Sequence, residues 1–170
     1  MTDTRSDSLG GRCLKLGDDI NTDILIPGRY LVSIDPAELA THALEPLGEE
    51  VQARLRASQV LVAGRNFGGG SAREQAATCL IGAGVQAVVA AGFARAFFRN
   101  AINVALIAVE CPPAVEAARD GEEVHVNVEA GTVETAGQVF EFTPYPPALR
   151  KIVDGGGLIP SLAREMEARA

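Results

Sequence analysis

The sequence has few cysteines, and their spacing does not predict a structural framework. Cys13, Cys79 and Cys111 are the only three, and no two of them form a CxxC pair. Spacings this wide predict neither a disulfide scaffold nor a cysteine metal site, and free thiols are typical of a reducing compartment. We therefore expect a cytoplasmic protein with no metal of its own.

Long hydrophobic runs are also missing. The richest apolar stretch, residues 85–98, is interrupted by Gln86, Gly92 and Arg95, which excludes a membrane span. Residues 1–8 are polar and lack the apolar core of a secretory signal peptide. Membrane-spanning and secreted proteins are both disfavoured.

Positive charge is scarce as well. The 15 Lys and Arg residues face 22 Asp and Glu residues, which gives a formal net charge of −7. Such a composition offers no basic footprint for a phosphate backbone, so a nucleic-acid-binding role is disfavoured. A small anionic substrate stays compatible with it, because one local cluster of arginines can override the net charge. The length of 170 residues and the hydrophobic fraction of 47% predict a single folded domain.

The middle of the chain alternates between apolar strands and helices. Residues 60–64, 85–90 and 105–110 predict buried strands, and residues 72–81 and 93–103 predict the helices between them. This order is that of a βαβαβ unit, which folds as a parallel sheet with helices packed on it.

The flanking regions follow another pattern. Residues 123–129 alternate between polar and apolar side chains, and residues 132–135 and 139–143 predict further antiparallel strands. We also expect a strand at 13–16, a helix opening at Asp35 and Pro36, and a helix from Pro146 to Gly155. The expected architecture is α/β, three-layered or barrel-like, with a mixed sheet. We expect one domain over 1–170, with 1–12 and 161–170 as flexible tails.

Residues 65–74 (RNFGGGSARE) are the segment most suggestive of chemistry. Three consecutive glycines precede Ser71, between a predicted strand and a predicted helix. A loop at that place presents backbone N–H groups and the positive end of a helix dipole, and glycines let a ligand approach closely. The pattern suits a carboxylate or a phosphate.

Two nucleotide-binding motifs fail on spacing. A P-loop counted from Gly64 requires a lysine where Gly70 stands, and a dinucleotide fingerprint from Gly68 meets Arg73 in place of its third glycine. What remains is the hydroxyl of Ser71 and the guanidinium of Arg73, which can grip a carboxylate with two hydrogen bonds. A plain capping box, with Ser71 as the N-cap and Glu74 reaching back, explains the same residues without function. Both interpretations stay open at this point.

Other polar residues have structural explanations. The loop at 17–23 (GDDINTD) is typical of Asx turns and lacks the spacing of a calcium loop. His42 and His125 have no metal-like partner in the sequence. Arg95 and Arg99 share a helix face and either add positive field to an anion site or form surface ion pairs.

Three segments carry a family resemblance. Residues 17–31 (GDDINTDILIPGRYL), 65–74 and 93–103 (FARAFFRNAIN) resemble, in this order, the small subunits of 3-isopropylmalate dehydratase. These belong to the aconitase superfamily, in which they form the swivelling domain. The resemblance runs from about Gly17 to Leu158.

The resemblance implies a β/β/α swivel domain that closes over a separate large subunit, as a heterodimer or heterotetramer. The large subunit of such enzymes holds a [4Fe-4S] cluster, and this chain holds no cofactor. The family isomerises 2- and 3-isopropylmalate by removing and re-adding water, in leucine biosynthesis. The implied partners are the large subunit and a small dicarboxylate substrate, with no nucleic acid and no membrane.

The family's site residues can be assigned to the matching positions of this sequence. The resemblance makes Ser71 the base that takes the carbon-bound proton and Arg73 the residue that holds a substrate carboxylate. Gly70 and Ala72 of the same motif are expected at the substrate.

Two further segments carry over. Thr22 and Asp23 match a Thr-Asp pair that orients either the serine loop or the substrate. Substrate choice falls on Tyr30, Leu31, Val32 and Ser33, where relatives that accept an extra carboxylate carry an arginine. Val32 instead packs an alkyl group, for about 1 to 2 kcal/mol.

Three positions depart from the family pattern. Gly69 stands where a cysteine is usual, Ala72 replaces a second serine, and Gln75 replaces a histidine. These departures leave open a related hydro-lyase for another alkyl-malate or a homoaconitate-type substrate. They also leave open a non-catalytic carboxylate-binding paralogue.

Overall fold

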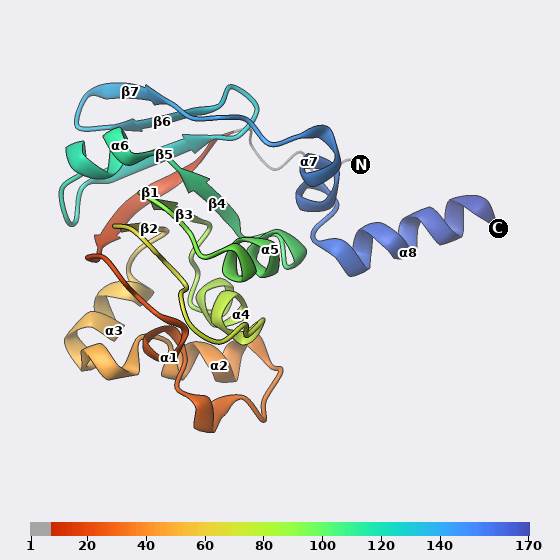
Figure 1. Ribbon diagram of the computed structural model, residues 1–170, viewed down its shortest axis with the longest axis horizontal. Coiled ribbons are helices and arrows are strands. Elements are labelled where there is room, and N and C mark those ends of the chain that lie inside the picture. The colour runs from red at the N-terminus through yellow and green to blue at the C-terminus, as the bar shows by residue number, and fades with distance from the viewer. Residues whose placement is uncertain (1–7) are drawn as a thin grey trace.

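The computed structural model describes residues 8–170 and contains one mixed seven-stranded sheet with the order β4-β3-β2-β1-β5-β6-β7 (Figure 1). The strands are β1 (Ser8–Lys15), β2 (Val60–Ala63), β3 (Ala87–Ala90), β4 (Ile107–Glu110), β5 (Glu123–Asn127), β6 (Thr132–Thr135) and β7 (Gln138–Glu141). Strands β1 to β4 pair in parallel, and β5 to β7 pair antiparallel. Strand β1 joins the two parts, because it also pairs antiparallel with β5.

Short helices surround the sheet. The first group comprises α1 (Thr22–Leu25), the 3₁₀ turn η1 (Gly28–Tyr30), α2 (Pro36–His42), the 3₁₀ turn η2 (Glu45–Leu47) and α3 (Glu49–Arg56). The second comprises α4 (Gln75–Gly82), α5 (Arg95–Asn103), α6 (Pro112–Ala117), α7 (Pro147–Asp154) and α8 (Leu158–Arg169). Helices α1 to α4 lie on one side of the parallel strands, and β5 to β7 lie on the other (Figure 1).

Each face of the parallel strands buries its own core. In β2, Leu61 belongs to the cluster shared with α1 to α4, whereas Val60 and Val62 belong to the cluster shared with β5, β6 and α6. All three side chains are fully buried. A strand buried on both faces must be apolar along its whole length, which is why 60–64 forms an uninterrupted apolar run. The layers are therefore helices, parallel strands and antiparallel strands, and the expected three-layer α/β fold with a mixed sheet is confirmed.

Several sequence-based expectations shift in their boundaries. The helix expected over 72–81 begins only at Gln75. The expected strand at 13–16 extends back to Ser8, so residues 8–12 are a paired part of β1 and not a tail, while 1–7 lie outside the described residues. Residues 161–169 belong to α8, a helix in place of the expected tail. The helix opening at Pro36 is confirmed, with the Asp35 carboxylate accepting from the Ala37 N–H at 3.0 Å.

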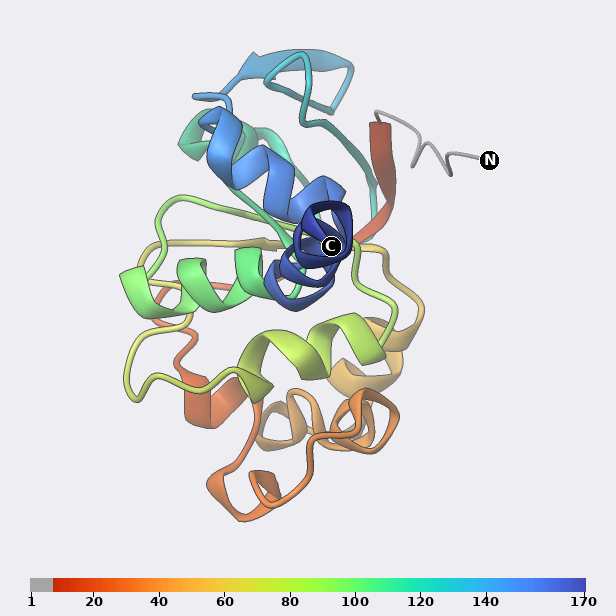
Figure 2. The same ribbon diagram turned by 90° about the vertical axis from the view of Figure 1, so that its right-hand side faces the viewer.

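The last helix, α8, extends away from the body of the molecule (Figures 1 and 2). Its inner side meets α5 and α7, and Ser161 donates to the Ile152 carbonyl at 3.3 Å. Its other side exposes Ile159, Leu162 and Met166. No helix in residues 8–170 is both long enough and apolar enough to cross a bilayer.

Candidate active site

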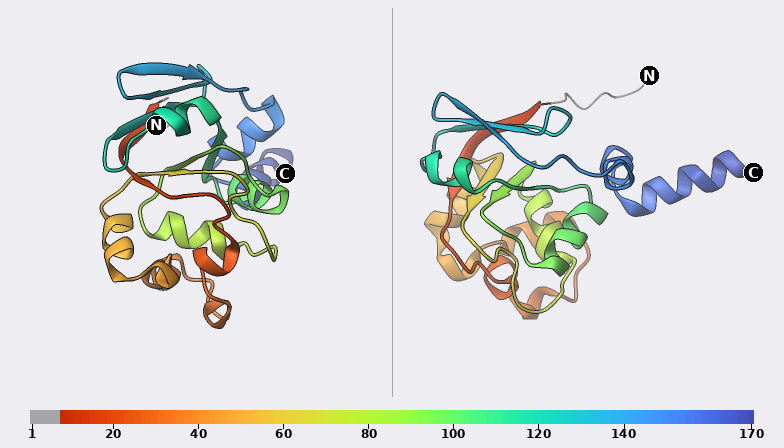
Figure 3. Two further views of the ribbon diagram at one scale, coloured as in Figure 1. Left: turned by 60° about the vertical axis from the view of Figure 1, so that its left-hand side comes forward. Right: turned by 45° about the horizontal axis from the view of Figure 1, so that its top comes forward.

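Two loops meet where the parallel strands β1 and β2 end. The Asp19 N–H donates to the Arg65 carbonyl at 2.9 Å, and the Gly68 N–H donates to the Ile20 carbonyl at 2.8 Å. Carboxyl ends of neighbouring parallel strands lie at one edge of a sheet, so loops that are distant in sequence come together there. The loop after β3 joins them, because Phe67 forms an isolated parallel bridge with Phe93. The three loops run together beside α1 and α4 (Figure 3).

Acidic side chains in the loop after β1, the first loop, form hydrogen bonds to the loop after β2, the second loop. The Asp18 carboxylate accepts from the backbone N–H of Arg65 at 2.7 Å and from its guanidinium at 3.1 Å. These bonds lower the pKa of Asp18, the backbone bond most of all. Asp19 accepts from the Asn66 side-chain amide at 3.0 Å. The polar run at 17–23 thus bridges two loops, and only Asn21 caps locally, accepting from the Ile24 N–H at 2.9 Å at the start of α1.

Glycines at 68 and 70 are required by the backbone of the second loop. Gly68 has φ +79° and lies against the Phe97 side chain, which leaves no room for a Cβ. Gly70 has φ +93°, a region that favours glycine. The loop therefore turns sharply around Phe97 and returns to the surface at Ser71.

Ser71 lies exposed on this loop, ahead of α4 and not on it. The N-cap of α4 is Glu74, without a side-chain capping bond, so the capping-box alternative for Ser71 and Glu74 is wrong. The expected position of Ser71 at the start of the helix is wrong as well. Across the described residues, no backbone carbonyl accepts from the N–H groups of Gly70, Ser71 or Ala72. These backbone N–H groups are therefore free to donate to a ligand at this loop.

Arg73 is tied to the segment that begins at α1. Its Nη1 forms an ion pair with the Asp23 carboxylate at 2.6 Å and donates to the Ile26 carbonyl at 3.3 Å. The Arg73 side chain is 16% exposed and that of Asp23 is 69% exposed. The ion pair ties Arg73 to the segment at α1, ahead of the first turn of α4.

Thr22 is buried at the same place. Its N–H donates to the Gly69 carbonyl at 2.9 Å, and its hydroxyl is buried without a hydrogen-bond partner among the described residues. A Cβ on Gly70 would lie 3.4 Å from that hydroxyl. Thr22 therefore contacts the serine loop and is shielded from solvent, which supports the loop-orienting alternative of the two expected for it.

The four residues expected to choose the substrate lie at the surface beside α2. Val32 is 94% exposed, whereas the Tyr30 hydroxyl donates to Glu45 at 2.8 Å. Ser33 donates to Glu38 at 2.6 Å, and the Leu31 carbonyl accepts from Gln75 at 3.3 Å. Sequence reasoning missed Glu45, because a single acidic residue in a short 3₁₀ turn carries no motif.

The remaining candidates lie elsewhere. Arg95 and Arg99 line a shallow surface pocket with Glu110, apart from Ser71 and Arg73. His42 contacts Glu45 and His125 contacts Glu123, at 2.8 and 3.6 Å. Within residues 8–170 no three His, Cys, Asp or Glu side chains gather in a way that could hold a metal ion.

The cysteines are not a cofactor site. All three are free and buried, and burial raises the pKa of the Cys79 thiol to about 12. They lie on β1, on α4 and directly after β4, so an iron–sulfur cluster does not fit this chain.

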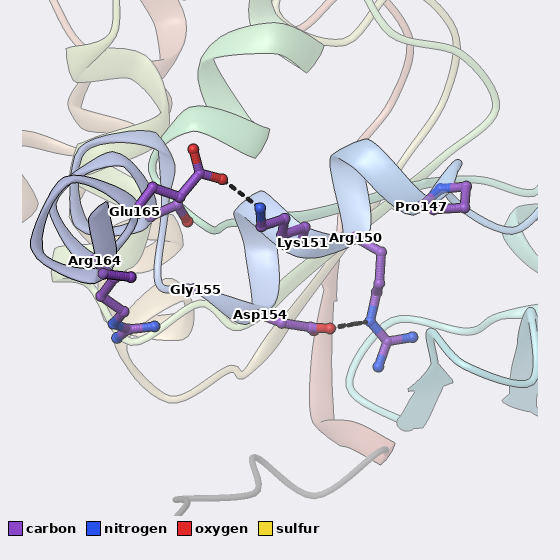
Figure 4. A pocket seen from close by; sticks show the side chains of 9 residues that line it. Pro147, Arg150, Lys151, Asp154, Gly155, Arg164 and Glu165 are labelled. Carbon is purple, nitrogen blue, oxygen red and sulfur yellow. Dashed lines mark hydrogen bonds and ion pairs between the residues drawn. The ribbon is translucent and has the colours of Figure 1, made fainter. Parts of the chain in front are cut away.

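A second surface cleft lies between α7 and α8 (Figure 4). It measures about 630 Å³ and is crossed by ion pairs from Arg150 to Asp154 and from Lys151 to Glu165. It includes none of the predicted site residues.

Known proteins match both the fold and the sequence. Residues 44–114 match the family model of the aconitase C-terminal domain. The crystal structure of 3-isopropylmalate dehydratase (leuD) from Methanocaldococcus jannaschii is similar, with a TM-score of 0.88, 35% identity, and coverage of 95% of this chain and 97% of that one. The fold class is therefore that of the aconitase C-terminal domain.

Sequence relatives narrow the class. The 3-isopropylmalate dehydratase small subunit of Moorella thermoacetica is 42% identical, over 92% of this chain and 96% of the relative. That of Pyrobaculum aerophilum is 51% identical, over 88% and 93%. The chain belongs to the family of 3-isopropylmalate dehydratase small subunits, which are parts of hydro-lyases, and the resemblance drawn from the three sequence segments is confirmed.

Proposed function

We propose that this chain, with a separate large subunit, interconverts 2-isopropylmalate and 3-isopropylmalate by removing and re-adding water. The reaction serves leucine biosynthesis. The observation that carries the proposal is an exposed Ser71 on a loop with unpaired N–H groups, two residues from an arginine held at the same surface.

Ser71 is the base in this proposal. A serine hydroxyl is a very weak base, so it must gain alkoxide character, which the N–H groups of Gly70, Ser71 and Ala72 stabilise. The alkoxide, whose own proton has gone to solvent, takes the proton from the substrate carbon. The electrons of that C–H bond form the double bond as the hydroxyl on the neighbouring carbon leaves, and re-addition of water runs these steps in reverse. Ala72 contributes only its backbone to this step, so the missing second hydroxyl does not remove the base.

Arg73 binds a substrate carboxylate. Asp23 and the Ile26 carbonyl occupy its Nη1, and the rest of the guanidinium can donate to a carboxylate of the substrate. Asp23 sets the orientation of Arg73, and Thr22 supports the loop that carries Ser71. Both act on substrate through these neighbours.

The exposed side chain of Val32 contacts the alkyl group. An isolated valine at 94% exposure gains by being covered, and an isopropyl group covers it without a charge partner. Tyr30, Leu31 and Ser33 shape the loop around it.

The large subunit supplies what this chain lacks. The relatives are named small subunits, and the buried, scattered cysteines here cannot bind a cluster, so we assign the [4Fe-4S] cluster to the large subunit. We also infer that the chain works as one swivelling unit. We place it in the cytoplasm, because its three thiols are free.

The test is anaerobic reconstitution of the chain with its large subunit and measurement of isomerisation. We expect turnover of 2-isopropylmalate by the complex and none by this chain alone. A complex with the Ser71→Ala substitution that retains the wild-type rate contradicts the assignment of Ser71 as the base. A wild-type complex that turns over no alkyl-malate contradicts the proposed function.

A further inference from the structure

The loop of Tyr30, Leu31, Val32 and Ser33, here called the specificity loop, exposes its central side chain almost completely. Val32 is 94% exposed and Ile34, just beyond the loop, is 85% exposed. A valine that projects this far discriminates between substrates only if its backbone is held in place, because a mobile side chain adapts to any neighbour.

One anchor is the carboxylate of Glu45. It accepts from the Tyr30 hydroxyl at 2.8 Å and contacts His42 Nδ1 at 2.8 Å, and it also forms an ion pair with Arg29. The His42 and Tyr30 rings stack with centroids 3.5 Å apart and an interplanar angle of 9°. These contacts lower the pKa of Glu45, through the His42 bond first and the Tyr30 bond second. The side chain of Tyr30 is therefore turned toward η2 and fixes the start of the specificity loop.

The other anchor is Gln75, the first residue of α4. Its side-chain Nε2 donates to the Leu31 carbonyl at 3.3 Å, directly before Val32. Two residues earlier, Arg73 donates to the Ile26 carbonyl at 3.3 Å. One short segment of chain thus carries the carboxylate-binding guanidinium and also holds the peptide that precedes Val32.

We propose that Gln75 and Glu45 are positioning residues that set the place of Val32 relative to Arg73, and thereby select the size of the alkyl group on the substrate. This inference rests on the proposed function. With a carboxylate bound to Arg73, the place of Val32 decides how large a substituent fits between them. Gln75, which departs from the family pattern, therefore links the loop that carries Ser71 to the specificity loop.

The test compares substrates of different size in the reconstituted complex. The quantity is the ratio of kcat/KM for 2-isopropylmalate to kcat/KM for 2-methylmalate. In Gln75→Leu, which keeps the bulk and loses the donor, we expect this ratio to fall about 3- to 10-fold. The loss should be in KM for 2-isopropylmalate, with kcat changed less than about twofold, because the base and the arginine remain.

Rescue and a second anchor variant keep the result interpretable. Gln75→His restores a ring N–H donor, and we expect it to return the ratio to within about twofold of wild type. Glu45→Ala should lower the ratio in the same direction. Gln138→Leu on β7 and Glu116→Ala on α6 are matched exposed controls and should leave it unchanged.

The outcomes separate the two proposals. Turnover by every complex with an unchanged ratio in both Gln75→Leu and Glu45→Ala overturns the positioning role and leaves the proposed function intact. A fall in the ratio that Gln75→His does not restore also overturns it. Failure of the wild-type complex to turn over any alkyl-malate overturns the proposed function and this inference together. If Gln75→Leu does not fold, the other two variants decide. A lower ratio in Glu45→Ala with a near-wild-type ratio in Gln75→His supports the positioning role, and an unchanged ratio in Glu45→Ala overturns it.

Discussion

The parallel and antiparallel parts of the sheet bury their strands differently. Strands β2 and β3 are buried along their whole length, whereas β5 alternates between exposed and buried residues and β7 is almost entirely exposed. All the predicted site residues follow or flank the parallel strands. The antiparallel part mainly covers the second face of those strands. The candidate site therefore lies on the parallel part, and the antiparallel part completes the core beneath it.

The largest expected effect concerns Ser71, the proposed base. Ser71→Ala in the reconstituted complex should lower kcat about a thousandfold, because the proton acceptor is lost. The exposed hydroxyl stabilises no packing, so we expect the free energy of unfolding to stay within about 0.5 kcal/mol. The same loss of a hydroxyl at an exposed position just after β7, Thr143→Val, should leave kcat unchanged. A large effect of Thr143→Val would break the division between the two parts.

The next effect concerns the cores. Leu61→Ala on β2 removes a fully buried side chain and should lower the free energy of unfolding by about 3 kcal/mol. Val139→Ala on β7 removes a side chain that is 64% exposed and should change it by less than about 0.5 kcal/mol. Urea unfolding of both variants measures the contrast. Equal losses would show that β7 is covered in solution.

A smaller effect concerns the carboxylate-binding arginine. Arg73→Lys keeps the charge but loses the planar guanidinium that donates two parallel hydrogen bonds to a carboxylate. We therefore expect kcat/KM to fall about 10- to 100-fold, mostly through KM. Arg119→Lys, an exposed arginine just before β5, should have no effect on either constant. Steady-state kinetics with 2-isopropylmalate distinguish them, and an unchanged KM in Arg73→Lys would contradict the binding role.

The smallest effect compares two buried threonines. Thr22 and Thr135 are each 2% exposed, but only Thr135 has a partner for its hydroxyl, the Glu123 carbonyl at 3.3 Å. Thr135→Val should lower the free energy of unfolding by about 1 kcal/mol, whereas Thr22→Val should leave it unchanged or raise it by about 1 kcal/mol. Thermal and urea unfolding measure both. A loss in Thr22→Val equal to that in Thr135→Val would show that its hydroxyl is hydrogen bonded in solution.

The sequence predicted the regions where burial leaves an unambiguous pattern. The strands at 60–64, 85–90 and 105–110 are apolar because both faces are buried, and residues 123–129 alternate because one face is exposed. Helix α3 was not predicted, since it is highly charged and buries only Gln52 and Leu55. The long β1 was only partly predicted, because Gly10 and Gly11 disfavour a strand until β5 pairs with it.

The site was predictable where its residues are adjacent in sequence. Ser71 and Arg73 were singled out from the glycine loop, and the structure places both on that loop. The helix start was misplaced, because the ion pair from Arg73 to Asp23 is a contact between distant segments. Glu45 and the bond from Gln75 to Leu31 could not be found, because they depend on how α2, η2 and α4 pack. Long-range side-chain contacts have no local pattern in the sequence.

The bonding of three loops into one edge has a consequence for how the protein is made. The segments at 17–23, 64–74 and 91–94 contact one another only once all three exist, and β1 needs β5 as its second neighbour. A nascent chain that ends at Ala63 lacks the loops at 64–74 and 91–94 and strand β5. Synthesis therefore makes Ser71 after the loop at 17–23, to which its own loop bonds, and before the loop at 91–94 and strand β5.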